Sequence, residues 1–169
     1  MSQKPGREPE LDRLGRESFI SLFLAAGRLT DEVDDVCKAE GLTMSHYTVL
    51  WVVCLAAPEH PDGVPMRLIA DGVLTRAADA TRLVDRLTRD GYVERKPSEQ
   101  DRRVVLVRAT RAGRALFKRL TADVKALHRE QWSTLTLAEL RTLRTLLVKA
   151  LWGEAAPEAR HPLESLPPL

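Results

Sequence analysis

The stretch from residue 75 to residue 108 constrains the fold more than any other part of the chain. An amphipathic helix is predicted over residues 75–90, and Gly91 can end it. Two short β-like runs follow at residues 92–96 and 104–108, and the residues between them favour a charged turn. Projected at 100° per residue, the helix has an apolar face of Ala80, Leu83, Val84 and Leu87 and an outer face of Ala78, Arg82, Asp85 and Arg89.

Three helices are predicted before this stretch. Residues 11–40 place apolar side chains at steps of three and four, the spacing of one helix face, and Gly41 can end this helix. Thr43 is a candidate N-cap for a second helix, which is apolar almost all round as far as Leu55 and is therefore expected to be buried. Residues 58–63 favour a loop, and Pro65 suits the first turn of a short third helix.

Two more helices are predicted after the hairpin. Thr110 can cap a long helix with an apolar stripe, and Thr136 and Glu139 form a capping box for the last helix. Residues 153–169 hold four prolines and no hydrophobic period, which predicts a flexible tail. The two stripes consist of Leu116, Leu120, Val124 and Leu127, and of Leu140, Leu143, Leu147 and Leu151.

These elements predict a fold that is mostly α with a small β-hairpin, namely a winged helix-turn-helix head with long N- and C-terminal helices. Residues 43–109 form the head, and residues 11–40 and 110–152 form the flanking helices of the same domain. Their apolar stripes exceed what so small a domain can cover internally, so we expect them to pair with a second copy. Residues 1–10 are expected to be flexible.

Net charge alone identifies no partner, because it is only +2. Its distribution is more informative, since residues 76–111 hold ten Lys or Arg and six Asp or Glu, a local charge of +4. The remaining residues therefore carry −2. A cationic middle suits a surface that meets phosphate, although a solvated charged face often has an asymmetry of this size.

Several classes of function lack support in the sequence. No apolar run approaches the roughly 20 residues of a membrane span, and the N-terminus has no signal core, so we expect a cytoplasmic protein without a membrane partner. The two cysteines and four histidines lack metal-ligand spacing, and no nucleophile motif or phosphate loop occurs. We therefore expect neither an enzyme nor a bound metal or cofactor.

A winged helix-turn-helix reads duplex DNA by placing a helix in the major groove, where the base edges are distinguishable. Ala78 allows close approach and can contact a thymine methyl, whereas Arg82 can pair with guanine or hold a phosphate. At the hairpin tip, an arginine gains from the negative potential of a narrow minor groove, while Asp101 repels DNA unless it orients a neighbouring arginine. The candidate DNA-binding residues are Thr75, Arg76, Ala78, Asp79, Thr81, Arg82, Arg86, Asp101, Arg102 and Arg103.

Three segments resemble the MarR family of bacterial transcriptional regulators. TRLVDRLTRDGYVERKPSEQDRRVVLVRATRAGRAL (residues 81–116) is similar to the family's recognition helix, wing and following helix start. GLTMSHYTVL (41–50) resembles the helix before the reading head, and TLAELRTL (136–143) resembles the closing dimerisation helix. The chain departs from the family pattern at His46, where glutamine is common, at Leu74, and at Arg76 and Ala77. Thr75 can cap the recognition helix in place of the usual serine.

The resemblance implies a homodimer that binds a palindromic operator on double-stranded DNA with one winged head per subunit. It implies that Asp101 braces the wing and that Arg103 enters the minor groove. It also implies a repressor that releases DNA when a small, often aromatic, effector enters a cleft between the dimer helices and the head. Candidate effector-binding residues there are Arg16, Phe19, Phe23, His46, Tyr47 and Trp51.

The ordinary interpretation of the effector candidates is a structural role or, for Arg16, a solvated or ion-paired surface position. Phe19, Phe23 and Trp51 have the spacing of packing residues, and His46 occupies a first turn, where a helix-capping histidine is common. Two alternatives to the repressor stay open, an oxidation sensor acting through Cys37, whose thiol pKa Lys38 can lower, and a dimeric interaction protein that does not bind DNA. Cys54 lies in an apolar helix and is expected to be inert. Activation instead of repression also stays open.

Overall fold

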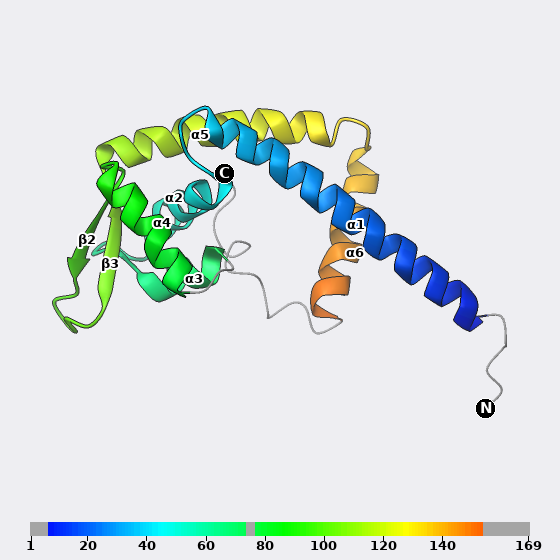
Figure 1. Cartoon of the computed structure of the whole chain (residues 1–169), viewed down its shortest axis with the longest axis horizontal. Coiled ribbons are helices and arrows are strands. Elements are labelled where there is room, and N and C mark those ends of the chain that lie inside the picture. The colour runs from blue at the N-terminus through cyan, green and yellow to red at the C-terminus, as the bar shows by residue number, and fades with distance from the viewer. Residues whose placement is uncertain (1–6, 74–76, 154–169) are drawn as a thin grey trace.

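The computed structural model describes residues 7–73 and 77–153 (Figure 1). Six helices and three short strands follow one another in these ranges, and the predicted mostly helical winged fold is confirmed. The elements in chain order are α1 (Arg7–Lys38), α2 (Met44–Leu55), β1 (Val64–Pro65), α3 (Met66–Val73), α4 (Ala77–Arg89), β2 (Val93–Pro97), β3 (Val105–Ala109), α5 (Arg111–Gln131) and α6 (Leu137–Trp152).

Helix α2 forms the centre of the head. Val49, Leu50 and Val53 of this helix are buried, as its apolar sequence predicts. The C-terminal part of α1 joins the same core through Val33 and Cys37. Each large apolar side chain buried in this way stabilises the fold by about 1.5–3 kcal/mol. The other elements that pack on α2 contribute Ile69, Val84, Leu87, Val107, Leu116 and Leu120.

Three helices begin at the threonine caps that the sequence predicts. Each threonine hydroxyl satisfies a backbone N–H that has no acceptor within its helix. The cap therefore fixes where the helix starts. Each hydroxyl accepts from the N–H three residues later: Thr43 from His46 at 3.4 Å, Thr110 from Gly113 at 3.0 Å, and Thr136 from Glu139 at 3.3 Å.

The sheet has one strand more than the sequence predicts. The hairpin is present, with each strand one residue later than expected, but β1 pairs antiparallel with β3 and gives the order β1-β3-β2. Pro65 pairs with Leu106 and ends β1, so the expectation that it opens the third helix is wrong by one residue. Its missing N–H is tolerated because β1 is an edge strand.

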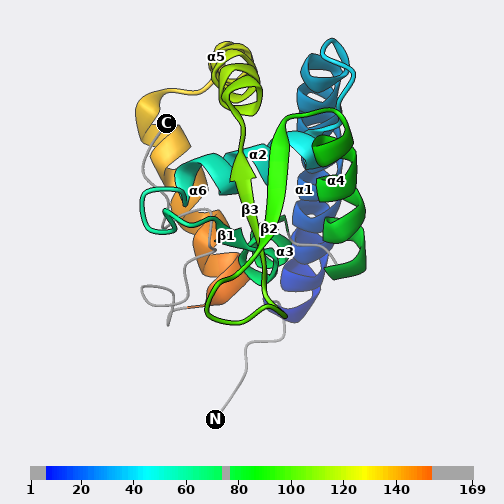
Figure 2. The ribbon, with the colours of Figure 1, turned by 90° about the vertical axis from the view of Figure 1, so that its left-hand side faces the viewer.

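The recognition helix and the hairpin lie side by side. Figure 2, which faces the hairpin end, shows α4 running beside β2, with β1 beyond β3 on the other side. We use the name wing for the β2–β3 hairpin with its turn, residues 93–109. The helix and the wing therefore face the same end of the molecule, away from the outer half of α1 (Figure 1).

Helix α1 extends far beyond the head (Figure 1). It begins at Arg7, so residues 7–10 are helical although the sequence predicts a flexible segment there. Pro9 is compatible with this start because the first N–H groups of a helix have no intrahelical acceptor. Large apolar side chains are exposed on the outer parts of α1 and α6, including Leu11, Leu14, Phe19, Ile20, Phe23, Leu24, Leu137, Leu146 and Leu151.

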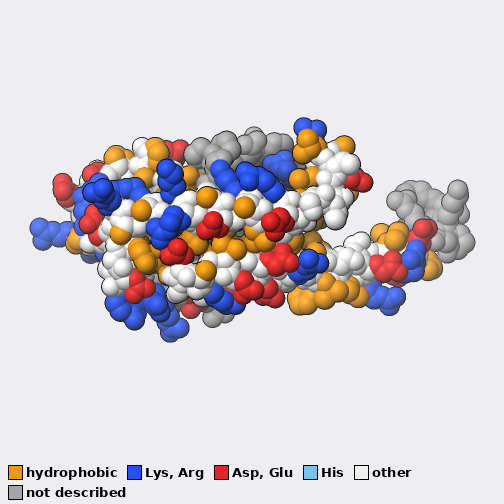
Figure 3. All heavy atoms as spheres, turned by 90° about the horizontal axis from the view of Figure 1, so that it is seen from above, with side chains coloured by type: hydrophobic (Ala, Val, Ile, Leu, Met, Phe, Trp, Pro, Cys, Tyr) orange, Lys and Arg blue, Asp and Glu red, His pale blue; other side chains and the backbone are white. Residues whose placement is uncertain are grey.

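Cationic and apolar side chains are distributed unevenly over the surface, although both kinds occur along the whole molecule (Figure 3). Figure 3 shows blue Lys and Arg side chains gathered at the hairpin end, and an orange apolar stripe on the opposite, extended part of the molecule. Among the described helices, none is long and apolar enough to cross a lipid bilayer.

Candidate nucleic-acid interface

Helix α4 presents the face that the sequence predicts. Ala80, Val84 and Leu87 are fully buried against the head, whereas Thr81, Arg82, Asp85, Arg86 and Arg89 are exposed. Asp79 is half-buried. Thr75 and Arg76 lie outside the described residues, and so does the side chain of Ala78, whose backbone belongs to α4.

The two candidate arginines on α4 differ in how they are held. The side chain of Arg82 is 83% exposed, and its guanidinium lies 3.9 Å from Asp79, at the outer limit of an ion pair. The Nε atom of Arg86 lies 2.6 Å from the carboxylate of Asp90, one turn further along the helix. Because exposed pairs contribute about 0–1 kcal/mol, Arg82 can turn to another anion at little cost. Arg86 must first leave a closer partner.

Asp101 organises the wing tip through backbone hydrogen bonds. Its carboxylate accepts from the N–H of Arg103 at 2.9 Å, and its carbonyl oxygen accepts from the N–H of Val104 at 2.9 Å. Ser98 closes the other side of the turn, because its hydroxyl accepts from the N–H of Gln100 at 3.2 Å. Arg102 and Arg103 are exposed on this turn. Asp101 is thus positioned to shape the loop that carries both arginines.

Arg95 connects the wing to α4, although in the sequence it only adds to the local positive charge. It lies on β2, and its Nη1 atom is 2.6 Å from the Asp85 carboxylate on α4. Its Nη2 atom donates to the Thr81 carbonyl oxygen at 3.0 Å. The period-2 pattern of the strand could have indicated which face Arg95 occupies, but not its partners, which are 10 and 14 residues away in the chain.

The turn between α4 and the wing is joined to the start of α5 at a close backbone contact. The N–H of Thr110 donates to the Tyr92 carbonyl oxygen at 3.0 Å, and the Thr110 hydroxyl donates to the Gly91 carbonyl oxygen at 2.8 Å. A Cβ atom on Gly113 would collide with the Tyr92 carbonyl. Only glycine therefore fits the first turn of α5 here, and the end of the recognition helix is held directly against a flanking helix.

The six predicted effector residues do not lie together in one pocket of the described structure. Arg16, Phe19 and Phe23 lie on the exposed part of α1, and the two phenylalanine rings stack on each other at a centroid distance of 6.3 Å. Tyr47 is buried, its ring stacks on Phe117, and its hydroxyl lies 3.3 Å from that of Thr121. Trp51 is half-buried against the core. The α1 residues and the α2 residues thus belong to different parts of the molecule.

His46 completes the cap of α2. Its Nδ1 atom accepts from the backbone N–H of Thr43 at 3.2 Å, which makes a reciprocal capping box with the Thr43 hydroxyl. Burial lowers the pKa of His46, and the nearby Arg86 guanidinium lowers it further, while Asp90 and Asp34 act in the opposite direction. The neutral, accepting form of the ring is therefore favoured.

The pKa of the Cys37 thiol is raised, whereas the sequence predicts that Lys38 lowers it. The side chain is fully buried, and burial together with the Asp34 carboxylate raises its pKa to about 11. Lys38 does not lower this pKa, because its ammonium pairs with Asp35 at 2.8 Å and with Asp34 at 3.2 Å. Burial also raises the pKa of Cys54 to about 11. Neither thiol has the thiolate character that oxidation requires.

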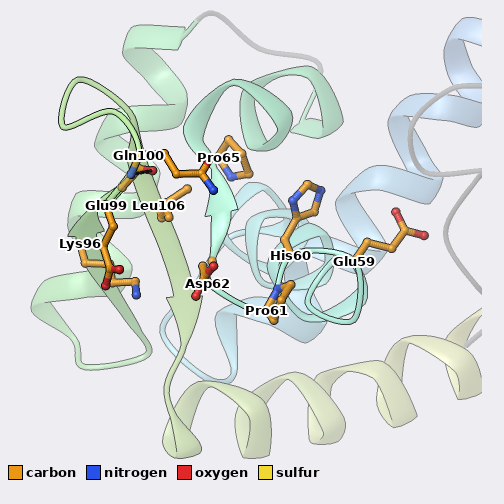
Figure 4. Close-up of a pocket in the computed structure, with 11 residues that line it drawn as sticks. Glu59, His60, Pro61, Asp62, Pro65, Lys96, Glu99, Gln100 and Leu106 are labelled. Atoms are coloured by element: carbon orange, nitrogen blue, oxygen red, sulfur yellow. Dashed lines mark hydrogen bonds between the residues drawn. The ribbon is translucent and has the colours of Figure 1, made fainter.

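A cavity of about 280 Å³ opens between the loop before β1 and the turn side of the wing (Figure 4). His60 and Asp62 come from the loop before β1, and Lys96, Glu99 and Gln100 come from the wing on the other side. Its floor is the paired row Pro65, Leu106 and Lys96 across the three strands. The loop, which the sequence places at residues 58–63, thus contributes one wall of this cavity.

Two larger hollows lie on the flanking helices. A hollow of about 580 Å³ lies between α1 and the end of α5, where the Gln131 amide donates to the Leu29 carbonyl oxygen and to Glu32. An apolar groove of about 510 Å³ runs along α6 and is lined by Trp132, Leu137, Leu140, Arg141, Leu143, Arg144, Leu147, Val148 and Leu151.

Comparisons with known proteins agree on one family. Residues 40–104 match the model of the MarR family. The transcriptional repressor IacR of Pseudomonas putida is 27% identical over 142 residues, which are 83% of this chain and 82% of IacR. The transcriptional activatory protein BadR of Rhodopseudomonas palustris is 28% identical over 139 residues, 82% of this chain and 78% of BadR.

Two solved structures show the same fold. CouR of Rhodococcus jostii, bound to p-coumaroyl-CoA, superposes with a TM-score of 0.70 at 27% identity and covers 82% of this chain and 94% of CouR. A cysteine-substituted MarR of Escherichia coli in complex with operator DNA superposes with a TM-score of 0.67 at 25% identity and covers 89% of this chain and 99% of that one. By sequence and by structure, the chain belongs to the MarR family of transcriptional regulators.

Proposed function

We propose that this protein is a homodimeric, sequence-specific DNA-binding repressor that leaves a palindromic operator when a small molecule binds. The observation that carries the proposal is the exposed face of α4, which presents Thr81 and Arg82 beside a wing tip with two exposed arginines. A helix of this kind fits the major groove, and a wing arginine fits the adjacent minor groove. The structural likeness to an operator-bound MarR supports the same arrangement.

Within this proposal the DNA-contacting residues have different tasks. Thr81 and Arg82 read base edges or hold a phosphate on the major-groove side, together with Thr75, Arg76, Ala78 and Arg86 from the predicted set. Arg103 enters the minor groove, and Arg102 contacts the backbone beside it. Asp101 acts through the turn that it organises, since its carboxylate is engaged with the N–H of Arg103.

The exposed apolar faces support a two-fold dimer. Phe19 and Phe23 are 67% and 69% exposed on α1, and the groove on α6 is predominantly apolar in its lining residues. Single exposed apolar side chains are ordinary, but a contiguous apolar groove marks an interface. A two-fold dimer repeats the head and matches half-sites about 10 base pairs apart on an inverted repeat.

The direction of regulation and the effector are inferred from the relatives. IacR is named a repressor and BadR an activatory protein, so relatives of this chain act in both directions. Repression is the direction that the family resemblance implies, and the position of the operator relative to the promoter sets it. CouR binds an aromatic acyl thioester, so an aromatic carboxylic acid or its thioester is the first effector class to test. A regulator of this kind works in the cytoplasm, where its DNA is.

The experiment compares Arg103→Ala with a matched surface variant on DNA. A binding site is first selected from random oligonucleotides by the wild-type protein, and affinity is then measured by fluorescence anisotropy. We expect Arg103→Ala to weaken binding by about 1–3 kcal/mol and to reduce the dependence of affinity on salt. Arg129→Ala removes the same charge from the exposed surface of α5 and is the control.

Two results would contradict the proposal. A selection that enriches no sequence, from a protein that is still a dimer, supports the interaction-protein alternative instead. Equal affinities for wild type and Arg103→Ala on an enriched site show that the wing does not contact DNA. A thermal-shift screen with aromatic acids addresses the effector separately, because a ligand at 100 times its Kd stabilises the folded protein by about 2.7 kcal/mol.

A further inference from the structure

We propose that Arg95 is a positioning residue of the DNA interface, which joins the wing to the recognition helix so that both meet the duplex at a fixed spacing. This inference rests on the proposed function. Arg95 is not among the residues expected to contact DNA, and it lies at the inner end of the wing rather than at its tip. Its importance comes from what its guanidinium holds together.

The guanidinium bridges two points on α4 that are one helical turn apart. Nη1 lies 2.6 Å from the carboxylate of Asp85, and Nη2 donates to the Thr81 carbonyl oxygen at 3.0 Å. A planar guanidinium makes such a two-point contact with fixed geometry, whereas a lysine ammonium acts as a single point charge. Arg95 therefore specifies both the distance and the orientation between β2 and this turn of α4.

The rest of the side chain is packed rather than solvated. The side chain of Arg95 is 27% exposed, and its Nε atom is buried without a hydrogen-bond partner among the described residues. A buried polar atom without a partner is costly, so it persists only where the surrounding contacts hold the group in place. The bridge is therefore less solvated than the ion pairs of Arg82 and Arg86, whose side chains are 83% and 47% exposed.

The bridge connects the two surfaces that the proposed function uses. Thr81 and Arg82 lie on the turn of α4 that Arg95 holds. On the other side, Arg95 pairs with Val107 of β3, and the same two strands carry the turn with Arg102 and Arg103. A shift of β2 against α4 would therefore change the spacing between the helix and the wing arginines.

A simpler explanation makes an opposite prediction. Asp85 is 52% exposed on a face that also carries Arg82, Arg86 and Arg89, where a carboxylate repels phosphate. If Arg95 only neutralised Asp85, removing Asp85 would strengthen DNA binding. If Arg95 positions the wing, removing Asp85 breaks the bridge and weakens binding, although an unfavourable negative charge is lost.

The experiment measures affinity for the selected DNA site for Asp85→Ala, Arg95→Lys and the double variant Asp85→Ala/Arg95→Met. Positioning predicts that all three variants bind about fivefold to tenfold more weakly than wild type. Charge neutralisation alone predicts tighter binding by Asp85→Ala, and wild-type affinity for Arg95→Lys and for the double variant, which keeps the net charge. Tighter binding by Asp85→Ala, or wild-type affinity for Arg95→Lys or for the double variant, overturns the inference.

Hydrogen exchange in the DNA-free protein separates this inference from the proposed function. We expect amides of residues 93–105 to exchange faster in Asp85→Ala and Arg95→Lys than in wild type, while those of α5 stay unchanged. If the wild-type protein binds no DNA, the proposed function fails, and faster exchange in the wing alone still supports the bridge. Unchanged exchange in both variants overturns the bridge whatever the DNA result. Arg129→Ala is the control in both measurements.

Discussion

The carboxylate of Asp101 accepts a hydrogen bond from the backbone N–H of Arg103 at 2.9 Å, so an acidic residue shapes the turn that presents a wing arginine. This contact explains how an anion is tolerated at a surface that is proposed to meet phosphate. Its charge is engaged in the turn, and its loss would free the backbone at Arg103.

We expect Asp101→Ala to weaken binding to the selected DNA site by about 1–2 kcal/mol, because the turn loses the hydrogen bond that orders it. Asp101→Asn keeps an acceptor oxygen and removes the charge, and we expect it to retain most of the affinity. Anisotropy titrations at constant salt measure both. Tighter binding by Asp101→Ala would show that repulsion from DNA outweighs any effect on the turn.

Gly113 provides a test of the junction between the wing and α5. We expect Gly113→Ala to destabilise the protein by about 2–4 kcal/mol, because the new Cβ meets backbone atoms of Tyr92 that cannot move without the strand. Gly27→Ala is the matched control, since its Cβ meets nothing within 4 Å and alanine favours a helix. Thermal unfolding of both variants decides this prediction, and equal melting temperatures would contradict it.

The pH dependence of stability follows from the capping role of His46. Its pKa is lowered in the folded state, so between its folded pKa and its usual value near 6.5 the unfolded chain binds more protons. Stability is therefore fully present above about pH 6.5 and is lost as the pH falls through that value toward the folded pKa.

His46→Gln tests this assignment. Glutamine offers an acceptor to the same Thr43 N–H without titrating. We therefore expect the free energy of unfolding to decrease less between pH 7 and pH 5 in the His46→Gln variant than in wild type. Urea unfolding at a series of pH values measures the difference. Identical slopes for the two proteins would show that His46 does not carry this dependence.

The two thiols are expected to be inert in the folded protein. With pKa values of about 11, Cys37 and Cys54 hold very little thiolate at neutral pH. We expect no sulfenic acid or disulfide after brief treatment with dilute peroxide, and ready alkylation of both once urea is added. Mass spectrometry follows both reactions. Rapid oxidation of native Cys37, with loss of DNA binding that Cys37→Ala does not share, would restore the oxidation-sensor alternative.

Local contacts account for the parts of the fold that sequence patterns predict well. The threonine caps at residues 43, 110 and 136 depend on N–H groups only three residues away, so the sequence contains both partners of each bond. The buried face of α4 follows from helical period alone, because Ala80, Val84 and Leu87 recur at that spacing. The hairpin follows from two β-like runs around a turn.

The features that the sequence does not reveal depend on distant partners. Strand β1 has two residues, too few for a periodic signal, and it exists because Val64 and Pro65 meet β3 more than 40 residues later. The contact of Arg95 with Asp85 likewise needs the angle between β2 and α4. The burial of Cys37 depends on how the end of α1 packs on the head. Tertiary packing, not local preference, decides each of these.

The most direct test of the account is the stoichiometry and specificity of the wild-type protein on DNA. Sedimentation of the protein with a labelled inverted repeat from the selection measures both at once. We predict one dimer per repeat, with affinity that falls steeply as salt rises and drops at least tenfold when one half-site is scrambled. A monomeric protein, or equal binding to intact and scrambled repeats at low salt, would contradict the account.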